Sequence, residues 1–282
     1  MNKYYLELLP EFKAFCISDE VIEECKKQKI IPEIYLPDDA FTLMAVPRPK
    51  VDAPTVAFLL GREQGNYSVD WNYARTITKA GLKIKFVTYV KPEEQLQNCH
   101  GLILPDGIFS FPEKYYVYAA PDALEFPSIR AKAYVLCIRE ALRMGMPILG
   151  IDSGAQIIAG ELGLKLYRNR SFLDGSIQHK SADHRAHEVK LVPDTPLKEM
   201  MGQFKLIVNS HHDEIVSTEG NHSELEFYAF APDGAPEAWG NETKRILCIQ
   251  WHPEDYVTSG DQMMLRIYLW LTEKAKLFQT AG

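Results

Sequence analysis

The sequence predicts an α/β fold with a mostly parallel central sheet. From residue 54 onward, short apolar segments alternate with segments that have the length and pattern of helices. Several apolar segments end in Gly or Pro, as buried parallel strands often do. The chain has 282 residues, of which 46% are hydrophobic and 24% charged, so it can bury a large core. Strands that alternate with helices imply βαβ units with right-handed crossovers.

Residues 1–50 differ from the rest of the chain. Ser18 is expected to cap a helix over residues 19–29. The segment that follows contains several prolines, which indicate extended chain, at Pro32, Pro37, Pro47, Pro49 and Pro54. We therefore expect residues 1–50 to form an N-terminal extension and residues 51–282 to form one domain. The extension can cover a sheet edge, cap a pocket or contribute to an oligomer contact, and the sequence does not choose among these roles.

Between residues 54 and 151 the expected elements follow one another closely. The expected strands are residues 55–61, 82–90, 101–105 and 147–151, each rich in apolar side chains. The expected helices are residues 70–80, 92–98 and 128–144, and Gly81 and Gly145 are placed to end the first and the last of them. Residues 187–282 are more mixed. They contain four further expected strands, at 187–192, 204–208, 225–230 and 245–250, and a closing helix at 259–277.

The composition excludes several classes of function. The chain has 31 basic and 38 acidic residues, a net charge of −7 with neutral histidines. A broad surface for nucleic acid or for an anionic membrane needs clustered Lys and Arg, so we expect neither partner. The N-terminus lacks a signal-peptide core, and no apolar window is long enough to cross a membrane. We predict a cytoplasmic protein and leave open whether it forms a homo-oligomer.

The five cysteines indicate neither a disulfide framework nor a zinc site. They are odd in number and lack paired spacing, at Cys16, Cys25, Cys99, Cys137 and Cys248. Cys137 and Cys248 lie among apolar residues and are expected to be small buried hydrophobic side chains. No cofactor and no metal site is predicted.

The first chemically informative segment is Gly150-Ile151-Asp152-Ser153-Gly154, where a strand meets an expected helix. Glycines two residues on either side of Asp152 have the spacing of a nucleophile elbow. In such an elbow the central residue lies on a tight turn, and only glycine lets the neighbouring backbone pass. The central side chain is then exposed at a helix N-terminus, which favours negative charge.

Two further strand ends carry polar side chains. Gln250-Trp251-His252-Pro253-Glu254 places an imidazole near a carboxylate that can orient it. Val208-Asn209-Ser210-His211-His212 is a second strand that runs into polar residues. Each segment alone is more often an ordinary transition from a strand to a loop or a helix. Ligands bind outside the carboxyl ends of strands in open α/β sheets, so the three together indicate a site.

In this order, the three segments resemble the motifs of class I glutamine amidotransferases, and more closely those of the γ-glutamyl-γ-aminobutyrate hydrolase family. Shorter supporting matches are Leu102–Pro105, Ala186–Val189, Ala231–Gly234 and Glu237-Ala238. The resemblance covers about residues 54–277 and leaves residues 1–50 outside. It implies a flavodoxin-like three-layer sandwich and cleavage of γ-glutamyl amide bonds, with a small glutamyl-type molecule as the ligand.

The resemblance also implies roles for individual residues. His252 matches the general base, Glu254 matches the acid that orients it, and Asp152 occupies the nucleophile position. The backbone N–H groups of Ser153 and of the Asp106-Gly107 loop match the oxyanion hole. The residues that match the lining of the glutamyl pocket are Gln156, Ser210, His211 and His212.

The conflict lies at position 152, where the catalytic members of the family have cysteine and this chain has aspartate. A thiolate attacks an amide carbonyl to give a thioester, whereas a carboxylate would give a high-energy anhydride. Asp106 in the oxyanion loop adds a second carboxylate where the family usually has glycine. Ser153 is one residue past the elbow apex, which makes it a poor substitute nucleophile.

Three interpretations remain open. The chain has lost cysteine chemistry and binds a glutamyl-like ligand, another small ligand or a protein partner. Alternatively, it is an enzyme with altered chemistry, in which Asp152 acts as a base, as a nucleophile toward carbon or phosphorus, or as a metal ligand with His252 and His211 or His212. In the third interpretation, position 152 was changed from cysteine by engineering. We favour the first, a pseudoenzyme.

Overall fold

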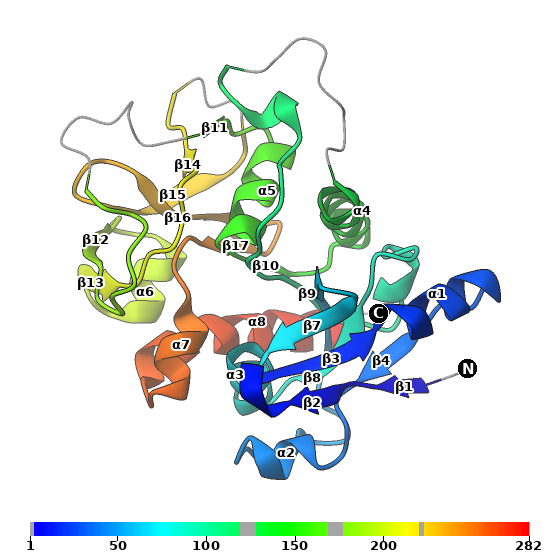
Figure 1. Cartoon of the computed structure of the whole chain (residues 1–282). Helices are drawn as coiled ribbons and strands as arrows, with labels where there is room; N and C mark the ends of the chain where they lie inside the picture. The colour runs from blue at the N-terminus through cyan, green and yellow to red at the C-terminus, as the bar shows by residue number, and fades with distance from the viewer. Residues whose placement is uncertain (1–2, 119–127, 169–176, 220–222, 282) are drawn as a thin grey trace. The chain divides into compact units, whose positions relative to one another are not determined.

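A computed structural model describes residues 3–118, 128–168, 177–219 and 223–281 (Figure 1). The chain divides into two compact units. The first contains Met1–Ile103, Arg139–Pro147 and Pro253–Gly282, and the second contains Leu104–Ile138 and Ile148–His252. Both units are discontinuous in sequence. The expected boundary at residue 50 stays a prediction.

The main sheet of the first unit has the strand order β1-β4-β8-β5-β9. Its strands are β1 (Lys3–Tyr5), β4 (Glu33–Tyr35), β8 (Lys83–Val87), β5 (Thr55–Leu59) and β9 (Gly101–Leu104). β5 pairs in parallel with both β8 and β9. β4 runs antiparallel to β8, and β1 runs parallel to β4. The predicted α/β class, with parallel strands joined by helices, is confirmed.

A second, antiparallel sheet of the first unit has the order β2-β3-β7-β6 (Figure 1). Its strands are β2 (Glu7–Leu9), β3 (Ala14–Ser18), β7 (Asn66–Asp70) and β6 (Gly61–Glu63). Phe15 of β3 is opposite Val69 of β7 and is fully buried. Residues 1–50 therefore contribute strands to both sheets of the first unit, and β1 and β4 extend one edge of the main sheet.

The helices of the first unit begin where the sequence supplies caps. The Ser18 hydroxyl accepts a hydrogen bond from Glu20 N, 3.1 Å away, at the start of α1 (Asp19–Lys27). The Asp70 carboxylate accepts one from Asn72 N, 2.6 Å away, at the start of α3 (Trp71–Lys79). The other helices are α2 (Ala40–Leu43), α7 (Pro253–Thr258), α8 (Gln262–Ala281) and the short 3₁₀ turns η1 (Pro10–Phe12) and η2 (Glu94–Leu96).

The second unit has the strand order β10-β17-β16-β15-β12-β13. The strands are β10 (Ile148–Ile151), β17 (Ile246–Ile249), β16 (Pro236–Asn241), β15 (Glu226–Phe230), β12 (His187–Leu191) and β13 (Lys205–Val208). β10 pairs in parallel with β17, and the strands from β17 to β13 pair antiparallel. Short connections such as the one between β16 and β17 suit antiparallel neighbours.

The remaining elements of the second unit are a two-stranded ribbon and short helices. The ribbon pairs β11 (Leu166–Tyr167) with β14 (Ile215–Val216). The helices are α5 (Ser153–Glu161), α6 (Pro196–Met201) and the turn η3 (Glu113–Tyr115), and α4 (Ile129–Met144) begins in this unit. All five cysteines are free and buried, as expected for Cys137 and Cys248. Among the described helices, none is both long and apolar enough to cross a membrane.

Candidate active site

Asp152 lies on a sharp turn between β10 and α5. Its backbone has φ 48° and ψ −115°, a conformation that residues other than glycine rarely adopt. The turn is fixed on both sides, because Asp152 N donates to Ile249 O at 2.8 Å and Gln156 N donates to Asp152 O at 3.0 Å. Strain of this kind collects at functional sites. The conformation is that expected of a nucleophile elbow.

Crowding around the elbow explains its two glycines. A Cβ at Gly150 would lie 2.6 Å from Ile158 Cδ1 and 2.8 Å from Ala155 Cα. A Cβ at Gly154 would lie 2.0 Å from Leu104 O. Neither position has room for a side chain, as the spacing in the sequence predicts.

The Asp152 carboxylate is buried and hydrogen-bonded. Gln250 Nε2 donates to Oδ1 at 2.7 Å, and Ser153 Oγ donates to Oδ2 at 3.2 Å. His252 Nε2 lies 3.9 Å from Oδ2. Burial raises the pKa of Asp152, and the neighbouring charges of His252 and His212 oppose this rise. Gln250 holds the carboxylate in place, a contact that the sequence analysis did not predict.

A pocket of about 440 Å³ opens in front of the elbow, within the second unit. Its lining residues are Asp106, Gly107, Ile108, Phe109, Phe111, Asp152, Ser153, Gln156, Lys180, His211, His212, Asp213, Glu214 and His252. The structure thus brings all but two of the predicted site residues to one cavity. Ser210 and Glu254 do not line it.

One asparagine fixes the backbone of His252. Asn209 Oδ1 accepts from His252 N at 2.9 Å, and Asn209 Nδ2 donates to His252 O at 3.3 Å. The centroids of the His211 and His252 rings are 5.1 Å apart. The two polar strand ends that the sequence singled out are therefore joined directly through Asn209, whose role the sequence analysis missed.

Gln156 and Ser210 use their polar groups within the protein. Gln156 Nε2 donates to Glu214 O at 2.9 Å and to Gln250 Oε1 at 3.1 Å. The Ser210 hydroxyl is fully buried and donates to His179 O at 2.5 Å. Gln156 still borders the pocket, whereas Ser210 shapes the turn that carries His211 and His212.

The loop predicted to form the oxyanion hole is held by Arg130, in the first turn of α4. Its Nη2 donates to Asp106 O at 2.5 Å, and its guanidinium lies 5.2 Å from the centroid of the Phe109 ring. Tyr134 Oη donates to Pro105 O at 2.8 Å. Nothing in the local sequence marks Arg130 as part of the site, because its partners lie in a distant loop.

Glu254 lies in α7 of the first unit. Its buried carboxylate accepts a hydrogen bond from Tyr268 Oη, 3.2 Å from Oε2. The role of Glu254 as the acid that orients His252 stays a prediction.

The metal set weighed from the sequence does not form. Among the described residues, one group of His, Cys, Asp and Glu side chains is compact enough to hold an ion, and it consists of His179, His187 and Glu237. Neither Asp152 nor His252 belongs to it. Those three residues were not predicted as site residues.

The chain is similar in sequence to a known protein family and to several known proteins. The profile of the family described as Peptidase C26 matches residues 61–254, a range that includes every residue lining the pocket. NtpR of Enterococcus hirae is 30% identical over 160 residues, which cover 54% of this chain and 66% of that protein. A Schizosaccharomyces pombe protein named "Putative glutamine amidotransferase PB2B2.05" is 28% identical over 231 residues, covering 80% of this chain and 88% of that protein.

A solved structure shows the same fold at low identity. The glutaminase domain of Trypanosoma brucei CTPS, solved with bound acivicin, superposes with a TM-score of 0.57 and 15% identity, covering 79% of this chain and 94% of that one. The fold predicted from the motifs, that of class I glutamine amidotransferases, is confirmed by this likeness. The family profile covers well over half of the sequence, and the chain belongs to the Peptidase C26 family.

Proposed function

We propose that this glutamine amidotransferase-like protein binds a small γ-glutamyl-type molecule in the pocket but does not hydrolyse it by cysteine chemistry. The observation that carries the proposal is the carboxylate of Asp152 at the apex of the elbow, where the family resemblance implies a cysteine. The elbow, its glycines and the adjacent His252 are in place. What differs is the attacking group.

The chemistry of a carboxylate supports this proposal. Attack by Asp152 on an amide carbonyl would give an anhydride, which is less stable than the amide it replaces. The charge that develops on the substrate oxygen would also face a carboxylate at Asp152 and a second one at Asp106. Loss of a single oxyanion-hole donor already costs about 3–4 kcal/mol of transition-state stabilisation, so opposing charge is a substantial barrier.

No neighbouring cysteine supports a substitute mechanism. Cys248 is the nearest along the sheet, because it is the register partner of Gly150. It is fully buried, and this burial raises the pKa of its thiol well above the ordinary value. A thiol that stays protonated and buried in β17 is a poor nucleophile.

The pocket supports binding of a zwitterionic head group. Its volume suits a small molecule, and it combines basic side chains with acidic ones. Lys180 and Asp213 form an ion pair with each other at the pocket, so His211 can meet a carboxylate and Glu214 can meet an ammonium group. Exposed Ile108 and the nearby Phe109 provide an apolar lip for the rest of the ligand. These charges match the α-amino acid end of a γ-glutamyl amide.

A second candidate function rests on the contact between His252 and Asp152. Burial raises the pKa of Asp152, and His252 Nε2 lies 3.9 Å from its Oδ2, so proton exchange between the two groups needs a closer approach or one bridging water when the ligand binds. In that case the chain would be a hydrolase in which Asp152 acts as a general base. Hydrolysis without a covalent intermediate distinguishes this function from the binding function.

The test combines binding with turnover. Calorimetry with γ-glutamyl-γ-aminobutyrate and with glutamine measures binding to the unmodified chain, and amine release measures hydrolysis. We expect binding without turnover. Asp152→Cys should gain hydrolysis, and Asp152→Cys with His252→Ala is the matched control that should lose it. Absence of binding by the unmodified chain, or its turnover at an ordinary enzymatic rate, would contradict the proposal.

A further inference from the structure

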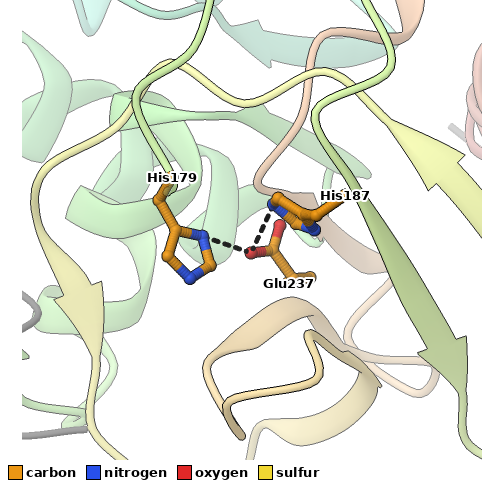
Figure 2. Close-up of side chains that lie close together, drawn as sticks. All are labelled: His179, His187 and Glu237. Atoms are coloured by element: carbon orange, nitrogen blue, oxygen red, sulfur yellow. Dashed lines mark ion pairs between the residues drawn. The ribbon is translucent and has the colours of Figure 1, made fainter. Parts of the chain in front are cut away.

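Three histidines surround one glutamate inside the second unit, in a cluster formed by His179, His187, His212 and Glu237. Glu237 Oε1 lies 3.1 Å from His179 Nδ1, 3.6 Å from His187 Nε2 and 3.6 Å from His212 Nε2. All four side chains are almost completely buried. Figure 2 shows the rings of His179 and His187 beside the Glu237 carboxylate, with both ion pairs drawn. The four side chains come from separate segments that the fold brings together.

In each ring, the outer nitrogen, which points away from Glu237, already contacts an acceptor. These contacts are His179 Nε2 with Asp233 Oδ2 at 3.0 Å, His187 Nδ1 with Glu188 O at 3.2 Å and His212 Nδ1 with Glu214 O at 2.9 Å. Carboxylate and carbonyl oxygens only accept hydrogen bonds, so each outer nitrogen carries the proton. If the imidazole is neutral, its inner nitrogen, the one that faces Glu237, then presents a lone pair to the carboxylate.

Without a cation among them, the three inner ring nitrogens and Glu237 Oε1 are all acceptors that face one another. Three lone pairs would face a carboxylate oxygen, and buried polar atoms without partners are costly. None of the three inner nitrogens, nor Glu237 Oε1, makes a hydrogen bond of acceptable geometry. A proton on one ring would give Glu237 a single donor and leave the other two inner nitrogens with lone pairs facing it, and protonation of all three rings would bury three positive charges around one carboxylate. One divalent cation would satisfy the same four atoms together.

The spacing suits a tetrahedral ion. Metal bonds of about 2.0–2.1 Å in tetrahedral geometry separate neighbouring ligand atoms by about 3.3–3.4 Å. The three distances from Glu237 Oε1, between 3.1 and 3.6 Å, bracket this value. The ligand atoms of His179, His187 and Glu237 all lie within 4.8 Å of one another, whereas His212 Nε2 lies 3.6 Å from Glu237 Oε1 but outside this compact group. Imidazole nitrogens with one carboxylate favour zinc, whereas calcium and magnesium prefer oxygen ligands.

We propose that His179, His187 and Glu237 bind a structural zinc ion, and that the His212 ring moves inward to become the fourth ligand when the ion binds. With His212 drawn in, four protein ligands would close the coordination shell, and their burial would leave no position for substrate or water, as in structural zinc sites. The outer contacts have the pattern in which a carboxylate or carbonyl orients each ligating histidine. The sequence predicts no metal site here, and the alternative metal set weighed from it lies elsewhere, around Asp152. This site does not rest on the proposed function.

The ion would brace one wall of the pocket. His212 borders the pocket and belongs to the cluster. The turn around it is also tied to His179, whose carbonyl accepts from Ser210 Oγ and from His212 N, the latter at 3.3 Å. Zinc would join this turn to β12 through His187 and to β16 through Glu237. We expect its removal to loosen the turn that carries His211.

The experiment uses the full chain, stripped with a chelator and dialysed. Zinc chloride is titrated by calorimetry, and cobalt(II) by visible absorption, where tetrahedral coordination gives intense bands. We expect one zinc per chain, a cobalt spectrum of the tetrahedral type, and a thermal midpoint that rises when zinc is restored. Asp233 holds His179 Nε2 and also accepts from Ile177 N and Ala235 N. Asp233→Asn, which keeps the size of this side chain, should weaken zinc binding about 10- to 100-fold, and His187→Gln should weaken it further.

The exposed His184, three residues before His187, supplies the matched control. His184→Gln should bind zinc as the unmodified chain does. If the stripped chain is folded by circular dichroism and binds no stoichiometric zinc, the proposal is wrong, whether or not His187→Gln folds. Zinc binding that is equally weakened by His184→Gln, or left unchanged by both Asp233→Asn and His187→Gln, would also overturn it.

Discussion

Substitution of Gly154 by alanine tests the geometry of the elbow. Gly154 lies in the first turn of α5, where alanine is intrinsically favoured over glycine by about 1 kcal/mol. The added Cβ, however, would lie 2.0 Å from Leu104 O, 2.6 Å from Leu104 C and 2.8 Å from Pro105 O. These are backbone atoms, which cannot rotate away, so the cost should reach the upper end of overpacking effects, about 3 kcal/mol.

The net expectation is a loss of about 2 kcal/mol of unfolding free energy, the difference between these two effects. For a chain of 282 residues, that corresponds to a thermal midpoint roughly 3–4 °C lower. Differential scanning calorimetry measures it, with Ser153→Ala as the control. That control changes the same turn without adding an atom and removes one hydrogen bond to Asp152, worth about 0.5–1.5 kcal/mol. A Gly154→Ala midpoint equal to or above that of the unmodified chain would refute the crowded elbow.

Two further predictions concern Asp152 and Asn209. Because burial raises the pKa of Asp152, the folded chain holds this proton more tightly than the unfolded chain, and the stability from protonation is lost as the pH rises through the folded pKa. In urea unfolding, the stability of Asp152→Asn relative to the unmodified chain should therefore rise from acidic to neutral pH. A difference in stability between the two chains that does not change with pH would contradict this. Asn209→Ala removes both hydrogen bonds to the buried His252 backbone and should cost about 2–3 kcal/mol. An unchanged urea midpoint would show that Asn209 does not hold His252.

Much of the α/β fold could be predicted because its signals are local. The apolar run of β5, the Ser18 cap of α1 and the Gly-spaced elbow all depend on neighbours in sequence. β16 (Pro236–Asn241) escaped prediction because it begins with proline and contains Glu237 and Gly240, which are rare in buried strands. Glu237 is buried there because histidines from distant segments surround it.

The division into two units and the histidine cluster depend on contacts far apart in sequence. Strands within residues 1–50 pair with β7 and β8, and these pairings join segments that are far apart in the sequence. His179, His187 and His212 lack the short spacing by which zinc sites are recognised in a sequence. The elbow was predictable in shape, but the hydrogen bond from Gln250 to Asp152 was not.

The most direct test of the central claim compares turnover of γ-glutamyl-γ-aminobutyrate by the unmodified chain and by Asp152→Cys. Amine release is followed under identical conditions, with folding checked by circular dichroism. We expect no turnover above the uncatalysed rate with aspartate at position 152 and measurable turnover with cysteine. Turnover by the unmodified chain at an ordinary enzymatic rate, about 1–1000 per second, would contradict the claim that Asp152 abolishes amide hydrolysis.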